Sequence, residues 1–217
     1  MKHIFKAAII IISIIFSFAG KSFSQVTDKD GNSYKTVTIG NQIWTAENFT
    51  VEHYRNGDAI PQEQDADKWS KLTTGAWCVY ENNNANGTTY GKLYNWHAVN
   101  DPRGLAPEGW HVASDAEWTK LIDVYGGEKA AGKKLKSTIG WLENTIATNE
   151  SGFTGIPGGM RNYDGFFYDI NKFGCFWSSS ESSNVFAWYH FLIYNYPDVA
   201  CFDGEKGRGM SVRCVKD

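Results

Sequence analysis

The sequence lacks the spacings that mark the commonest cysteine and glycine sites. It has only four cysteines in 217 residues, and no two of them form a Cys-x-x-Cys pair, which disfavours zinc-binding and thioredoxin-like classes. Its glycines do not follow the spacing of a phosphate-binding loop. Beyond the N-terminal residues, no segment is apolar enough to span a bilayer. These absences leave a globular protein without a marked active site.

The one long apolar run lies at the N-terminus. Residues 7–18 are apolar except for two serines, two lysines precede them, and serines at 22 and 24 suit cleavage before Gln25. The pattern predicts a signal peptide over 1–24 and one domain over 25–217, with an uncleaved membrane anchor as the alternative. No cysteine directly follows the run, which disfavours a lipoprotein. We therefore expect a secreted protein, either extracellular, periplasmic or on the cell surface.

Removal of the signal peptide makes the chain more acidic. The whole sequence has 21 basic and 24 acidic residues, and cleavage removes Lys2, Lys6 and Lys21 but no acid. The mature balance is 18 against 24, a net charge near −6. A mildly acidic surface argues against nucleic acid or an anionic membrane as the partner. The mature chain is not expected to insert into a membrane.

All four cysteines lie in the predicted mature chain, at Cys78, Cys175, Cys201 and Cys214. An even number in an exported protein predicts two disulfides. The sequence alone leaves all three pairings open.

Two polar segments have the composition of a cation or sugar site. Residues 28–32 begin like a calcium loop, but the glycine and the closing glutamate of an EF-hand are not at their positions. A hairpin turn is favoured there, with structural calcium as the alternative. Residues 81–87 carry four asparagines, and a solvated loop is favoured over a cation or sugar site. No cofactor is therefore predicted.

The first half of the chain predicts a hairpin followed by helices. Residues 34–39 alternate and are β-branched, and residues 42–45 follow a Gly-Asn turn, which predicts two paired strands. Ser114 and Glu117 form a capping box that starts a helix. Two glycines end this helix, and residues 128–137 predict a second short one.

The second half predicts loops and then strands. Residues 138–172 are rich in glycine and aromatics and predict a long loop region. Residues 185–193 are apolar on both faces, as in a central strand, and strands over 199–202 and 210–215 follow. Strands, two helices, loops and strands in this order predict an α+β fold with segregated elements.

Several motifs, in order along the chain, resemble the Fibrobacter succinogenes major paralogous domain. The resemblance covers about residues 27–217, essentially the whole predicted mature chain. The motifs lie at Val37–Phe49, Tyr90–Trp96, Gly109–Val112, Glu117–Trp118, Phe153–Arg161, Phe176–Ser180 and Ser211–Asp217.

The resemblance implies a C-type-lectin-like fold, distantly similar to the formylglycine-generating enzyme, in secreted or surface proteins of bacteria. The family has no established activity. Its members typically carry cysteines at the positions of Cys78 and Cys214, which implies that these two pair and that Cys175 pairs with Cys201.

The resemblance does not carry an enzymatic site into this chain. A formylglycine-type oxidase uses a nearby pair of reactive cysteines, whereas Cys201 and Cys214 are thirteen residues apart and serve better as disulfide partners. The calcium and sugar motifs of C-type lectins are absent. His190 lies in the most apolar strand, where a packed and hydrogen-bonded role is favoured over catalysis, and His111 is expected to pack or cap. We predict no catalytic residue, no metal ligand and no enzyme.

The remaining hypothesis is a binding module. Lectin-like folds place ligand contacts in the loops before the last strands, which here predicts Arg161, Tyr163, Asp164 and Tyr168 as contacts to a glycan or a protein. Packing against the sheet is favoured for Trp141 and Phe166. The alternative is a structural or interaction protein of the cell envelope without a small-molecule site.

Overall fold

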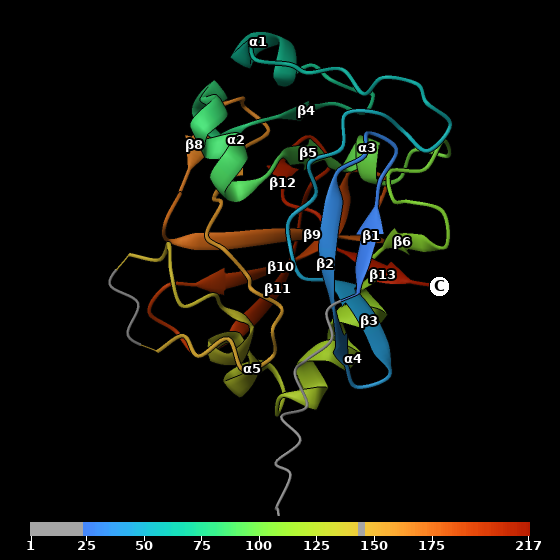
Figure 1. The fold of residues 1–217 in the computed structure, drawn as a ribbon. Coiled ribbons are helices and arrows are strands. Elements are labelled where there is room, and N and C mark those ends of the chain that lie inside the picture. Colours follow the sequence, from blue (N-terminus) through green and yellow to red (C-terminus); the bar gives the residue numbers. More distant parts are fainter. Residues whose placement is uncertain (1–23, 143–145) are drawn as a thin grey trace, which may run out of the picture.

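The computed structural model describes residues 24–142 and 146–217, which form antiparallel sheets together with five short α-helices (Figure 1). The predicted α+β class is confirmed in this coarse form. The predicted signal peptide lies outside the described residues, apart from Ser24. Among the described residues, no helix is both long and apolar enough to cross a membrane.

The elements have the following bounds. The helices are α1 (Ala66–Trp69), α2 (Asn84–Tyr90), α3 (Trp96–Val99), α4 (Asp115–Val124) and α5 (Glu128–Leu135), with a 3-10 turn η1 (Tyr80–Asn82). The strands are β1 (Gln25–Thr27), β2 (Ser33–Ile39), β3 (Gln42–Thr45), β4 (Trp77–Cys78), β5 (Leu93–Asn95), β6 (Trp110–Val112), β7 (Met160–Arg161), β8 (Phe167–Tyr168), β9 (Phe173–Glu181), β10 (Phe186–Ile193), β11 (Val199–Glu205), β12 (Gly209–Met210) and β13 (Cys214–Lys216).

The first sheet joins the two ends of the described chain, in the order β1-β2-β3-β13-β6. The predicted hairpin is confirmed: Ile39 pairs with Gln42, and Gly40 takes a positive φ of 60° in the two-residue turn. Residues 28–32 also form a turn, between β1 and β2. The Asp28 carboxylate accepts bonds there from two backbone amides, from the Asn32 side chain and from the Tyr34 hydroxyl. Groups of the protein itself therefore satisfy this carboxylate.

The second sheet consists of β9, β10 and β11, with β10 in the centre. This confirms the prediction of a central strand over 185–193. Helix α4 covers one face, where Leu192 and Val199 join Trp118 in a buried cluster. Tyr189 and Phe191 leave the other face and are only partly buried.

The third sheet has the order β4-β5-β12-β7-β8. The C-terminal stretch from Gly174 to Cys214 therefore contributes to all three sheets: it supplies most of β9 together with β10 and β11 to the second, β12 to the third and the first residue of β13 to the first. The last strands connect the sheets as well as completing one of them.

The helices follow their local signals, with one exception. Both bonds of the Ser114–Glu117 capping box are present at the start of α4. Beyond the end of α4, Gly126 and Gly127 take positive φ angles, which separate this helix from α5. The exception is the predicted loop over 81–87, which forms η1 and most of α2. Asn83 caps α2 by accepting a bond from the Ala85 amide, because an asparagine side chain satisfies the free amides of a first helical turn.

The predicted disulfides are wrong, because all four cysteines are free thiols. Cys175 lies opposite Phe191 and Cys201 lies opposite His190, so β10 separates the two cysteines by two strand spacings, about 9–10 Å. A disulfide requires Cα atoms within about 7 Å. Neighbouring residues of β10 also point to opposite faces, so the two thiols do as well. Cys78 and Cys214 belong to different core clusters.

Candidate functional site

Arg161 was predicted to contact a ligand, and the structure contradicts this. The side chain is fully buried, with 0% exposure, and donates hydrogen bonds to the carbonyls of Glu63, Gln64 and Gly165. Its guanidinium lies over the rings of Trp69 and Phe167, 4.4 and 4.9 Å from their centroids. Arg161 therefore joins the 138–172 region to the 61–69 segment and has no surface to offer a ligand.

The other three predicted contacts lie near the surface. Tyr163 and Tyr168 are 48% and 43% exposed, and Asp164 accepts a bond from the Phe166 amide in a tight turn. Their role as ligand contacts stays a prediction. Of the residues expected to pack, Trp141 is buried, whereas Phe166 is 62% exposed, so the packing expected for Phe166 is wrong.

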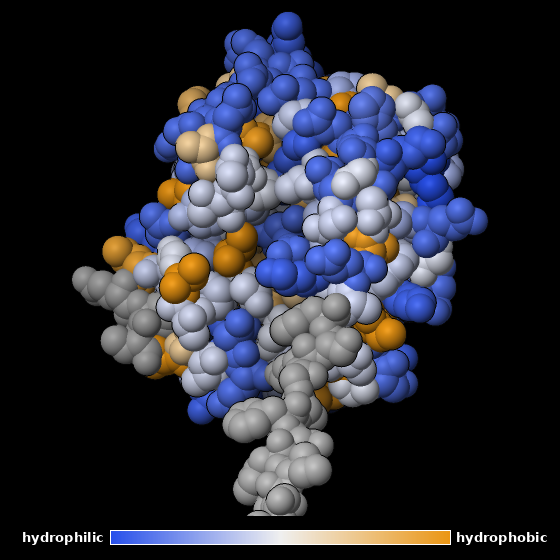
Figure 2. All heavy atoms as spheres, in the orientation of Figure 1, coloured by the Kyte–Doolittle hydropathy of each residue, from blue (hydrophilic) through white to orange (hydrophobic). Residues whose placement is uncertain are grey.

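A concave site with many polar groups lies elsewhere, between β2, the segment after β3 and the C-terminal end of α2. We call it the hydroxyl cavity. Its volume is about 470 Å³, which is within the range of small-molecule sites. Figure 2 shows this face as mostly hydrophilic and intermediate residues over α2 and β2. Its lining consists of Asn32, Ser33, Tyr34, Ala46, Glu47, Asn48, Thr50, Thr88, Thr89, Tyr90, Gly91, Thr154 and Ile156.

The back of the hydroxyl cavity is held by one buried amide and one buried guanidinium. Asn48 donates to the Tyr90 carbonyl at 2.8 Å and to Ser211 Oγ at 3.0 Å, and its Oδ1 accepts from Arg213 Nε at 2.8 Å. Arg213 also donates to the carbonyls of Thr45, Phe153 and Thr154. Burial lowers the pKa of Arg213 to about 9, which still leaves it charged at neutral pH. The wall of the cavity is therefore a fixed network.

The rim and sides of the cavity present hydroxyls, one carboxylate and one aromatic ring. Thr88 and Thr89 donate to helix carbonyls of α2, which leaves their oxygens able to accept. The Glu47 carboxylate accepts from the Lys35 amide at 2.9 Å. Tyr90 bonds Asn171 Oδ1 through its hydroxyl at 2.6 Å and is half-buried, and burial raises its pKa. The site offers hydroxyls and one carboxylate for hydrogen bonding, beside the aromatic side chain of Tyr90.

The sequence reasoning missed the hydroxyl cavity, although a signal for it was present. Three of the motifs that resemble the family supply seven of its lining residues: Ala46, Glu47, Asn48, Tyr90, Gly91, Thr154 and Ile156. Each motif contributes only part of the wall, so the cavity is recognisable only when the segments are brought together.

A second cavity, of about 590 Å³, lies between α4 and strands β10 and β11. We call it the helix–sheet cavity. His190 lines it and is packed against Trp118, with ring centroids 4.8 Å apart and planes at 16°, as expected of a buried histidine. It also bonds Asp115, and Asp115, His190 and Cys201 together bring an oxygen, a nitrogen and a sulfur within 4.8 Å of one another. These are the described residues that could hold a metal ion.

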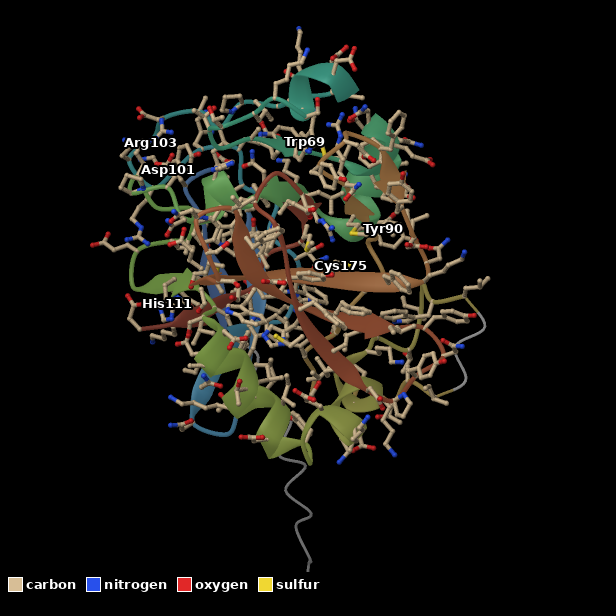
Figure 3. All side chains as sticks on the ribbon, turned by 180° about the vertical axis from the view of Figure 1, so that it is seen from behind. Trp69, Tyr90, Asp101, Arg103, His111 and Cys175 are labelled. Atoms are coloured by element: carbon tan, nitrogen blue, oxygen red, sulfur yellow. The ribbon has the colours of Figure 1, made fainter. Side chains whose placement is uncertain are left out.

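A second histidine–carboxylate group lies apart from both cavities. His111 Nδ1 is 2.6 Å from Asp217 Oδ1, and Nε2 is 2.8 Å from Glu117 Oε1, so His111 links β6 to the C-terminus and to the capping box. Burial alone would lower the pKa of His111, but the two carboxylates outweigh it and raise the pKa. Figure 3 shows His111 and Tyr90 on opposite sides of the molecule.

Comparison with known proteins identifies the family. No curated protein and no solved structure matches the chain. The model of the Fibrobacter succinogenes major domain matches residues 37–216. This range contains ten of the thirteen residues that line the hydroxyl cavity, and only Asn32, Ser33 and Tyr34 lie outside it. The chain belongs to the Fibrobacter succinogenes major domain family.

Proposed function

We propose that this chain is a secreted or cell-surface binding domain that holds a sugar unit of a glycan in the hydroxyl cavity. The observation that carries the proposal is the chemistry of the lining: threonine, serine and tyrosine hydroxyls, two asparagine amides and one carboxylate surround a cavity of about 470 Å³. A sugar presents hydroxyls that both donate and accept, and its C–H faces pack on aromatic rings.

The fixed network behind the cavity supports binding without rearrangement. Asn48 is 5% exposed and uses both its oxygen and its amide nitrogen within the fold. A preorganised wall avoids the entropy cost of ordering side chains when the ligand arrives. Acceptor capacity remains on Thr88, Thr89 and Glu47, and the two threonines are exposed to solvent.

Secretion and the lectin-like relationship are parts of the same proposal. The N-terminal pattern of residues 1–24 supports export, and an exported bacterial domain meets glycans of the cell surface or the environment. The mixed α+β architecture with antiparallel sheets is compatible with a C-type-lectin-like fold. The proposed contacts differ from the calcium-dependent ones of true lectins, since they are hydroxyls and amides of this chain.

The test is a glycan-array screen of the purified protein, followed by titration calorimetry with the glycan that binds. We expect Tyr90→Ala to weaken binding about 10-fold or more, because one aromatic contact contributes on the order of 1–3 kcal/mol. Thr88→Val keeps the shape of the side chain and removes the hydroxyl, and is expected to weaken binding by several-fold, about 1 kcal/mol.

Tyr163→Ala is the matched control, since Tyr163 is an exposed tyrosine outside the hydroxyl cavity. It is expected to bind as the wild type does. If Tyr163→Ala abolished binding while Tyr90→Ala did not, the site would lie in the 160–168 region as the sequence predicted. An array and a pull-down that both stay blank would contradict the binding function.

One observation favours a second function, docking of an envelope protein. The face of the second sheet that points away from α4 carries neighbouring aromatic rings: Phe191 lies 5.7 Å from Phe173, 6.0 Å from Tyr189 and 5.4 Å from Phe202 between centroids. Phe202 is 51% exposed on the edge strand β11, and such apolar patches mark interaction surfaces. Phe202→Ser would abolish a pull-down that depends on this face and leave glycan binding unchanged.

A further inference from the structure

His190 and Cys201 are brought together by strand pairing. They are directly opposite each other on β10 and β11, so their side chains leave the same face of the sheet with Cβ atoms about 4.5–5.5 Å apart. Asp115 is the first residue of α4, which packs over this face, and the N-cap at Ser114 sets where the helix begins. Figure 3 shows α4 beside the strands β10 and β11, in the colours of Figure 1.

The three side chains converge on one point. Asp115 Oδ1 lies 3.0 Å from His190 Nε2 and 3.5 Å from Cys201 Sγ, and Sγ lies 3.9 Å from Nε2. A tetrahedral zinc ion at ordinary bond lengths separates such ligand atoms by about 3.3–3.6 Å. An ion therefore fits among these atoms if they move by only about 0.5 Å or less.

The arrangement does not match a cysteine–histidine–aspartate catalytic triad. In a triad the acid bonds one ring nitrogen and the nucleophile faces the other, whereas Asp115 and Cys201 both face Nε2 of His190. The three groups are therefore not arranged for nucleophilic catalysis by Cys201.

We propose that Asp115, His190 and Cys201 bind a divalent transition-metal ion, best Zn²⁺, with its fourth position open to the helix–sheet cavity. Imidazole, thiolate and carboxylate are zinc ligands, and the sulfur disfavours Ca²⁺ and Mg²⁺. Asp123 and Glu128 also line the cavity, against the single cation Lys129, so the lining attracts positive charge. The site is separate from the hydroxyl cavity and does not depend on the proposed glycan function.

His190 is held in the orientation that a ligand needs. Its side chain is 2% exposed and stacks on Trp118, which points Nε2 towards the other two groups. Its Nδ1 is buried without a partner among the described residues. Metal-binding histidines usually donate this second N–H to an acceptor, so we expect weaker binding than at a closed structural zinc site.

The test titrates the purified, tag-free protein with Co²⁺ as a spectroscopic probe, and then with Zn²⁺. One Co²⁺ per chain should produce a thiolate-to-cobalt charge-transfer band that Zn²⁺ abolishes. Binding displaces the thiol proton to the buffer, so the apparent affinity should rise with pH. Cys201→Ser is expected to abolish the band, and Asp115→Asn to weaken Zn²⁺ binding by at least about 10-fold.

Asp123→Asn is the matched control, because it removes the same charge from the same cavity without touching the three ligands. It should keep the band and bind Zn²⁺ within about two-fold of the wild type. A further measurement needs no variant: Zn²⁺ should slow alkylation of Cys201 in the native protein. Absence of the charge-transfer band, wild-type binding by Cys201→Ser, or alkylation unaffected by Zn²⁺ would each overturn the proposal.

Discussion

The hydroxyl cavity and the helix–sheet cavity differ in how far the fold already uses their polar groups. At the first, Asn48 and Arg213 have bonded partners for their buried groups. At the second, His190 Nδ1 has no partner among the described residues, and Cys201 makes only contacts of 3.5 and 3.9 Å. The wall of the hydroxyl cavity therefore belongs to the hydrogen-bond network that holds the fold, whereas the helix–sheet cavity has polar groups without a full set of partners.

This difference predicts how much each cavity contributes to the stability of the fold and which kind of ligand suits it. A saturated network stabilises the native state and presents a rigid wall, which suits a neutral ligand that displaces water. Under-bonded groups contribute little to stability, and their convergence suits an ion that supplies the missing interactions. Substitutions at the two cavities should therefore differ in their effect on the free energy of unfolding, which Arg213→Met, Tyr34→Phe and Cys201→Ser test.

The largest effect is expected for Arg213→Met. The substitution keeps much of the volume but leaves four buried oxygens without their donor, those of Asn48, Thr45, Phe153 and Thr154. Relief of the desolvation cost offsets only part of this, so we expect the free energy of unfolding to fall by about 3–5 kcal/mol. Urea denaturation measures it; a loss below about 1 kcal/mol would show that the network is not the framework that we describe.

Tyr34→Phe should have an intermediate effect at the same cavity. Its hydroxyl donates to Asp28 Oδ2 at 2.6 Å and lies 2.9 Å from Thr50 Oγ1. Burial and the Asp28 carboxylate raise the pKa of Tyr34, so the group is a neutral donor. Loss of this buried bond is expected to cost about 1–2 kcal/mol, measured by thermal or urea unfolding. An unchanged midpoint would mean that water replaces the hydroxyl without loss.

Cys201→Ser should leave stability within about 0.5–1 kcal/mol of the wild type, because the thiol makes only long contacts. The same variant should lose nearly all thiol labelling of the native protein, since Cys78, Cys175 and Cys214 are at most 2% exposed. Mass spectrometry after a brief alkylation measures this. Cys175→Ser, on the opposite face of the sheet, is the control and should still be labelled at Cys201.

The smallest effect concerns pH and the His111 group. Because the folded-state pKa of His111 is raised above its ordinary value of 6.5, its contribution to stability is present below about pH 6.5 and lost as the pH rises through the folded pKa. His111 is partly exposed, so solvent screening holds this contribution below about 1 kcal/mol. His111→Asn should destabilise the protein at pH 5.5 more than at pH 9, in urea titrations at about these two values.

His111→Asn also serves as a control for the proposed metal site. Its two carboxylates lie on different ring nitrogens, so their oxygens do not meet at one point, and no thiol is present. His111→Asn should leave Zn²⁺ binding unchanged. A loss of binding with this variant would move the site away from the helix–sheet cavity.

Local signals in the sequence predicted much of the secondary structure. The capping box of Ser114 and Glu117 acts within one helical turn, and the Gly40 turn acts between adjacent strands, so neither needs the rest of the fold. Predictions failed where a residue's role depends on distant partners. Arg161 is a residue type common in ligand sites, but its partners Glu63 and Gln64 lie 98 and 97 residues away. Only the tertiary contacts show that it is buried.

The sequence by itself determined the α+β class, the hairpin, the capped helix and the family, because short-range hydrogen bonds, turn geometry and apolar patterning are all encoded in neighbouring residues. Only the tertiary structure decided that the cysteines stay apart, that two arginines are buried, and that three motifs share one cavity. It also placed Asp115 beside His190 and Cys201, 75 and 86 residues further along the chain. Strand register and helix packing set these neighbours, and both arise from the simultaneous burial of many side chains that no single segment specifies.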